Sequence, residues 1–186
     1  SAALVLDPII NGFHLTRVLM DSGSSLNLLY QDTVRKMVIN PSRIKPTKTT
    51  FKGVIPGVEA RCTGLITLEV VFGSSDNFRS EELIFDIVPF RRGCHALLGR
   101  TTFARFNAVP QYAYLKLKMP GPCGVITVNG NTELSLRTEE HTVALAAEVQ
   151  SGLHKQHHSA AAEPRDTIKR FRTTLQQDNT ARQELD

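Results

Sequence analysis

Several features that define familiar protein classes are missing from this chain. It has no tryptophan, and its three cysteines are scattered without a Cys-x-x-Cys pair, so we expect neither a disulfide framework nor a zinc site. No apolar run approaches the ~18 residues of a membrane span, so we expect no membrane association. The first residues lack both an initiator methionine and the basic start of a signal peptide. We therefore expect an intracellular segment of a longer polypeptide.

The composition suits one ordinary domain with an extension. The chain has 186 residues, and 41% of them are hydrophobic, which is enough for a substantial core. The net charge of +4 is mild and is spread along the chain. This charge permits proximity to nucleic acid but does not argue for binding, so we expect no direct nucleic-acid binding.

Two parts of the chain differ in pattern. Residues 1–130 consist of short β-type runs punctuated by glycine and proline, whereas residues 131–186 form a polar tail, weakly helical and partly disordered. The pairs Asn11-Gly12 and Asn129-Gly130 follow apolar runs and predict hairpin turns, because type I′ turns need positive φ twice. The expected strands cover residues 4–10, 13–20, 26–29, 65–72, 82–88, 96–98 and 125–128. The expected helices cover residues 30–37, 100–106, 138–150 and 166–177. Many short strands with two short helices predict an all-β barrel or sandwich in the first part.

The sharpest chemical feature follows the apolar run of residues 18–20. Asp21 stands at the end of this run, and Ser22, Gly23 and Ser24 come directly after it. Gly23 would let backbone N–H groups approach the carboxylate without a Cβ in the way, and the Ser24 hydroxyl could hydrogen-bond to it. Taken alone, these residues are also typical of an ordinary turn.

A second motif lies some 75 residues further on. Leu97 and Leu98 form a short apolar run that ends at Gly99, and a helix is predicted to begin at Arg100. By itself this pattern fits any buried strand that ends in a turn. The two motifs at this separation, with a glycine-rich hairpin between them, are far more specific than either one.

Together these motifs resemble those of pepsin-like and retropepsin-like aspartic proteases over residues 3–130. The triplet at Asp21 is similar to the catalytic triplet, and residues 97–100 are similar to the hydrophobic–hydrophobic–Gly motif that passes the active-site loop in a ψ-shaped crossing. The resemblance implies an acid-protease barrel with a flap at residues 51–58, in which Gly53, Val54, Ile55 and Gly57 would contact substrate. Residues 21–30 and 115–126 resemble, in particular, the protease of plant gypsy-type LTR retrotransposon polyproteins.

This resemblance implies an endopeptidase in which two aspartates activate a water molecule, without a metal or another cofactor. The sequence holds only one Asp-Ser-Gly triplet, so either two copies meet as a homodimer with Asp21 from each, or the chain is inactive alone. The substrate would be a polyprotein, and the family habit implies the cytoplasm or virus-like particles. Ser22 would brace the two catalytic loops against each other.

Other possibilities compete with this interpretation. The chain could be a catalytically silent retropepsin-fold module that binds peptides or only dimerises. A nucleic-acid-binding fragment would rest on the positive charge alone. His154, His157 and His158 could suggest a metal site, but they lie in a linker-like run without cysteines or an acidic cluster, so solvated linker residues are the better interpretation.

Overall fold

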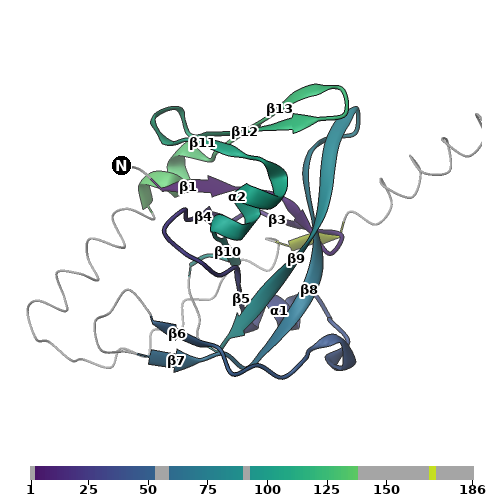
Figure 1. Ribbon diagram of the computed structural model, residues 1–186, viewed down its shortest axis with the longest axis vertical. Helices are drawn as coiled ribbons and strands as arrows, with labels where there is room; N and C mark the ends of the chain where they lie inside the picture. The colour runs from purple at the N-terminus through teal and green to yellow at the C-terminus, as the bar shows by residue number, and fades with distance from the viewer. Residues whose placement is uncertain (1–2, 53–58, 90–92, 138–167, 171–186) are drawn as a thin grey trace, which may run out of the picture.

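A computed structural model describes residues 3–52, 59–89, 93–137 and 168–170 of the chain (Figure 1). The largest element of the described structure is a nine-stranded sheet whose strand order is β1-β4-β10-β5-β9-β8-β2-β3-β14. The strands of this sheet are β1 (Leu4–Leu6), β2 (Ile9–Ile10), β3 (Phe13–Leu15), β4 (Val18–Met20), β5 (Leu28–Tyr30), β8 (Gly64–Ser74), β9 (Asn77–Val88), β10 (Ala96–Leu98) and β14 (Ile168–Arg170). The expectation of an all-β protein is therefore confirmed.

Two small sheets and a few helical turns complete the described architecture. A three-stranded sheet contains β11 (Val109–Gln111), β12 (Lys116–Gly121) and β13 (Gly124–Asn129), and β6 (Thr50–Lys52) pairs with β7 (Glu59–Arg61). The helices are α1 (Gln31–Lys36), α2 (Arg100–Phe106), the 3-10 turns η1 (Pro41–Arg43) and η2 (Tyr112–Tyr114), and a helical stretch at residues 132–137. None of the helices in the described ranges is long and apolar enough to cross a membrane.

The first hairpin forms where the sequence predicts it, but its strands are divided. Asn11 and Gly12 have φ of 49° and 76°, and Ile10 pairs with Phe13 across the turn. The first expected strand is interrupted after β1, where the proline at position 8 has no N–H to donate to a ladder. As a result β1 pairs with β4 rather than continuing into β2.

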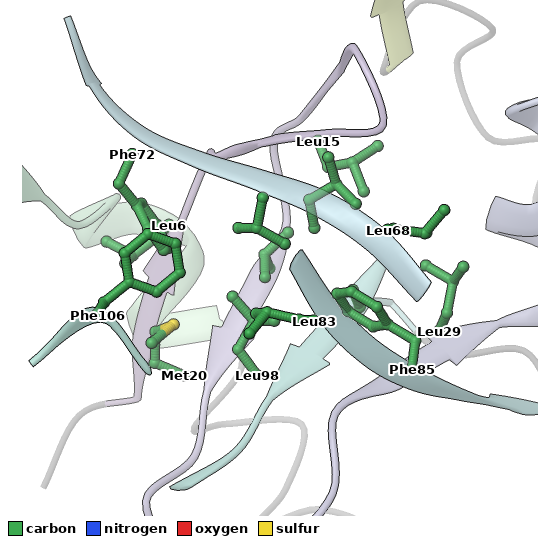
Figure 2. Close-up of a cluster of buried hydrophobic side chains, with 14 of the residues drawn as sticks. Leu6, Leu15, Met20, Leu29, Leu68, Phe72, Leu83, Phe85, Leu98 and Phe106 are labelled. Carbon is green, nitrogen blue, oxygen red and sulfur yellow. The ribbon is translucent and has the colours of Figure 1, made fainter. Parts of the chain in front are cut away.

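The core lies on the inner face of the long β8–β9 hairpin, which crosses the whole molecule in Figure 1. Side chains along β8 alternate, so that Ile66, Leu68 and Val70 are buried while Thr67 and Glu69 face outward. Figure 2 shows buried side chains from segments far apart in the sequence, such as Leu6, Leu29 and Phe106, gathered with those of β8 and β9. Both strands are longer than expected, because antiparallel pairing continues through polar residues to the turn at residues 75–76.

A crossing of short strands positions the rest of the molecule. β10 lies between β4 and β5, and it runs parallel to β4 and antiparallel to β5. β5 in turn runs parallel to β9. The loop at residues 21–27, which joins β4 to β5, must therefore pass the end of β10. This arrangement is the ψ-shaped crossing that the motifs predict.

The structure differs from expectation after the small sheet. No hairpin turn forms at Asn129-Gly130. The turn lies at residues 122–123 and joins β12 to β13, and Gly124, directly after it, has φ of 107°. Gly130 instead leads into a helical stretch, and the Asn131 Oδ1 accepts a hydrogen bond (2.9 Å) from the Leu134 N–H. The prediction of a hairpin turn at Asn129-Gly130 is wrong because Asn129 ends β13 and the next asparagine, Asn131, caps a helical stretch in place of a return strand.

The tail is described only in part. The expected helix at residues 166–177 is wrong at residues 168–170, which form β14 and pair antiparallel with β3. The outer edge of β3 offers unpaired backbone groups, and this pairing outweighs a weak helical periodicity. The expected helix at residues 138–150 lies outside the described residues, and the boundary at residue 130 stays a prediction.

Candidate active site

Asp21 stands at the end of β4, and its backbone is tied to the crossing strand. Its N–H donates a hydrogen bond to the carbonyl oxygen of Leu98, at 2.9 Å, which extends the β4–β10 pairing by one residue. The side chain of Asp21 is half-buried, whereas the preceding Met20 is buried in the core. The carboxylate is thus carried to the edge of the core by a strand that cannot shift without disturbing the sheet.

Gly23 allows a backbone donor to reach this carboxylate. The Gly23 N–H donates to Asp21 Oδ1 at 2.9 Å, and a Cβ added at position 23 would lie only 3.2 Å from the same oxygen. A contact at that distance is tighter than side chains normally make, so a larger residue would push against the carboxylate it serves. This is the approach that the sequence predicts for Gly23.

The expected hydrogen bond from Ser24 to the carboxylate is not what the structure shows. The Ser24 hydroxyl donates to the carbonyl oxygen of Leu26 at 2.9 Å and accepts from the Leu26 N–H at 3.2 Å. A serine hydroxyl readily bonds to backbone two residues ahead, and this local bond wins over the carboxylate. Ser24 therefore shapes the loop and acts on Asp21 only through the backbone, since its own N–H donates to the Asp21 carbonyl oxygen at 3.2 Å.

Ser22 is exposed and has a partner that the sequence did not reveal. The hydroxyl of Tyr112, from η2, donates to the Ser22 hydroxyl oxygen at 3.1 Å. The two residues are 90 positions apart, so no local pattern could have paired them. The Tyr112 ring packs against the main core, which fixes the position of its hydroxyl.

The second motif contacts the catalytic loop through its backbone. Arg100 N–H donates to the carbonyl oxygen of Ser24 at 2.8 Å, at the first turn of α2. A Cβ at Gly99 would lie 2.4 Å from the Leu26 carbonyl oxygen and 2.7 Å from that of Ser24. Only glycine fits at position 99, because the two chain segments cross in contact. Leu97 and Leu98 lie on opposite faces of β10, and both are buried.

Asn27 joins the parts of this crossing, and the sequence analysis assigned it no role. Its side chain is 4% exposed, and its Oδ1 accepts from the Gly99 N–H (2.9 Å) and the Thr102 hydroxyl (2.8 Å). Its Nδ2 donates to the carbonyl oxygen of Ile84 in β9, at 3.0 Å. An asparagine directly before a buried apolar strand is the one signal that could have identified it, because a buried amide must find partners.

A second apolar cluster covers the face of the crossing strands opposite the main core. Its members are Leu19, Leu26, Leu28, Tyr30, Cys62, Val88, Cys94 and Leu97. Burial raises the pKa of the Cys62 thiol, and the negative charge of Asp86 raises it further. Through Leu19 and Leu26, the cluster forms an apolar surface beside the loop that carries Asp21.

The predicted flap is described only at its base. β6 and β7 pair antiparallel, with Lys52 opposite Glu59, so the hairpin on which the prediction rests is present. Gly53, Val54, Ile55 and Gly57 lie outside the described residues, as do His154, His157 and His158. Within the described ranges no three His, Cys, Asp or Glu side chains gather as a metal site requires.

Comparisons with known proteins identify the architecture. No family model matches the chain, and no curated protein matches its sequence. Among solved structures, the chain is similar to the retroviral protease-like domain of Ddi1 from Leishmania major, with a TM-score of 0.51 and 15% identity over 72% of this chain and 97% of that domain. A retropepsin-like aspartic protease from Rickettsia conorii matches with a TM-score of 0.44 and 17% identity, over 69% of this chain and 83% of its own. By its likeness to the Leishmania domain, the fold of this chain is retroviral protease-like, that is, retropepsin-like.

Proposed function

We propose that the chain is an aspartic endopeptidase that works as a homodimer, with one Asp21 from each copy. Two carboxyl groups that face each other closely share one proton, because two adjacent negative charges repel. The ionised carboxyl takes a proton from water as the water attacks the peptide carbonyl carbon. The protonated carboxyl donates its proton to the carbonyl oxygen, which gives a neutral tetrahedral species with two hydroxyl groups. The carboxyl that took the proton from water then passes it to the amide nitrogen, and the other carboxylate takes a proton back from one hydroxyl as the C–N bond breaks and the amine leaves.

One observation supports this proposal most directly. The Asp21 carboxylate lies at the end of β4, oriented by the Gly23 N–H, in a loop bonded to β10 and α2. A reactive group needs such a rigid support, because small displacements from productive geometry cost rate. The retropepsin-like fold agrees with this role, since the loop lies at the strand crossing.

The natural substrate in this proposal is a polyprotein of a gypsy-type LTR retrotransposon. The support is the sequence resemblance at residues 21–30 and 115–126. Such a protease would release neighbouring segments of its own precursor in the cytoplasm or within virus-like particles.

Peptidase activity with a matched pair of variants tests the proposal. The purified chain is incubated with a mixed peptide library at pH about 4 to 6, with and without pepstatin. We expect cleavage that pepstatin stops and that Asp21→Asn lowers by about 10³-fold, the usual effect of removing general acid–base catalysis. Asp32→Asn is the control, because Asp32 lies in α1, outside the loop that carries Asp21, and forms an ion pair with Arg35 at 3.6 Å. Cleavage that persists in Asp21→Asn would contradict the proposal.

A further inference from the structure

Asp86 is a buried carboxylate close to the catalytic loop, and no step of the proposed mechanism uses it. It lies in β9, where it pairs with Leu28 of β5, and its N–H donates to the Asn27 carbonyl oxygen at 2.9 Å. Figure 1 shows these two strands side by side. The residue is 7% exposed, and its Oδ1 has no hydrogen-bond partner among the described residues. A buried carboxylate oxygen without a partner is costly, so it points to a ligand that supplies one.

This carboxylate lines a pocket that begins at the catalytic loop. The pocket has a volume of about 470 Å³, and Ser25, Leu26 and Asn27 form its wall on the side of the loop. Ile84 and Glu82, which share one face of β9 with Asp86, also line the pocket. A chain segment bound across Asp21 would therefore pass the mouth of this pocket.

The charges around the pocket favour a cation as its occupant. Glu82 contributes a second carboxylate to the lining. Arg105 also lines the pocket, but its Nε is paired with Glu81 Oε2 at 3.3 Å, so it is directed to another partner. The apolar surfaces of Leu26 and Ile84 would cover the methylene groups of a long side chain, while its charged end reaches Asp86.

We propose that this pocket is a substrate subsite that selects a lysine or arginine side chain near the scissile bond, with Asp86 as the specificity-determining partner. The proposal rests on the endopeptidase function given above. The long aliphatic stem fits between the apolar walls, and the ammonium or guanidinium group forms charge-assisted hydrogen bonds with the carboxylate that otherwise lacks a partner. A neutral side chain of equal length would leave that carboxylate buried and unpaired.

Matched peptides test the subsite. The cleavage sites of a peptide library are sequenced first, and peptide pairs are then made that differ only in lysine against norleucine at the position that varies least. We expect kcat/KM to favour lysine by about 10- to 100-fold, the range of a charge-assisted hydrogen bond, and Asp86→Asn to bring this ratio close to one. Asp76→Asn, which removes the same charge from the exposed β8–β9 turn, is expected to keep the wild-type ratio.

The possible results distinguish a failure of the subsite proposal from a failure of the endopeptidase proposal. Cleavage without a preference for a basic residue, or an unchanged lysine-to-norleucine ratio of kcat/KM in Asp86→Asn, would contradict the subsite proposal but not the endopeptidase proposal. If the wild-type chain cleaves nothing, the same peptides with a reduced, non-cleavable bond are titrated calorimetrically. Tighter binding of the lysine peptide that depends on Asp86 would then support the subsite alone, and equal binding would overturn it. If Asp86→Asn fails to fold, the lysine-to-norleucine ratio of kcat/KM for the wild-type chain is the test, and a ratio close to one would contradict the subsite.

Discussion

Asn27 illustrates how one side chain can hold a catalytic loop in place. Its amide bonds to backbone or hydroxyl groups of the β10–α2 turn and of β9, so it connects both segments that flank the loop. Asn27 is buried, so bulk water does not replace its side chain as a hydrogen-bond partner for these groups. Loss of the amide would leave donors and an acceptor unsatisfied in the interior, which costs more than the bonds themselves contribute.

We therefore expect Asn27→Ala to lower the free energy of unfolding by about 3 kcal/mol, the cost of leaving buried polar groups without partners. Urea unfolding followed by circular dichroism measures the difference. Asn40→Ala is the control, because Asn40 makes a similar bond to the Ser42 N–H (3.0 Å) but at an exposed 3-10 turn. Equal losses in the two variants would show that Asn27 has no special structural role.

Cys62 gives the molecule a pH dependence with a defined sign. Its pKa is raised by burial first and by the charge of Asp86 second, so the folded chain keeps the thiol proton after the unfolded chain has lost it. The free energy of unfolding should thus fall as the pH rises above the ordinary thiol value of 9.0. We expect a shallower fall in Cys62→Ala between pH about 8 and about 10. Cys123→Ala, at an exposed position, should keep the wild-type slope.

At the scale of elements, a hydrogen bond joins η2 to the loop that carries Asp21. Tyr112 donates to Ser22, which in the proposed dimer braces one loop against its partner. We expect Tyr112→Phe to weaken dimerisation about tenfold or more, because one modest hydrogen bond is lost from each copy. Sedimentation at graded concentrations measures the dissociation constant.

Tyr114→Phe is a matched control for this contact, since Tyr114 lies in the same turn and is 74% exposed. A double variant, Ser22→Ala with Tyr112→Phe, shows whether the two single changes weaken dimerisation through the same hydrogen bond or independently. If the two changes act through one contact, the double variant should be no weaker than the stronger single variant. Strictly additive effects would contradict the assignment.

Elements with local causes were predictable, and pairings between distant segments were not. The turn at Asn11-Gly12 and helix α2 follow from residue preferences within a few positions. The same reasoning failed at Asn129-Gly130, because the neighbouring Asn131 caps a helical stretch there and no return strand follows. The Asp-Ser-Gly motif predicted the approach of the Gly23 N–H to the Asp21 carboxylate, whereas the contacts of Asn27 with Ile84 and of Tyr112 with Ser22 join residues 57 and 90 positions apart. Such contacts leave no periodic trace in a single sequence.

At the scale of the whole molecule, the single Asp-Ser-Gly triplet of the chain is the reason for proposing a dimer. One chain contributes one Asp21, and the proposed chemistry needs two carboxyl groups that act as a unit. A C2 axis supplies the second from an identical copy, because a self-complementary surface needs only one sequence. Activity of the separate chains should then rise faster than linearly with protein concentration.

A tandem fusion of two copies, joined by a long Gly/Ser linker, tests this requirement without relying on free association. The linker raises the effective concentration of the second copy, so the specific activity of the fusion should no longer depend on protein concentration. We expect Asp21→Asn in one copy to lower peptidase activity by about 10³-fold, nearly as far as the change in both copies, because half of a shared acid–base pair cannot complete the reaction. A singly substituted fusion that kept half of the activity would mean that each copy contains a complete site. Asp32→Asn in one copy controls for the effect of the linker and of a lost surface charge. Retention of full activity in that control, together with loss in the Asp21→Asn fusion, would place both carboxyl groups in one shared site.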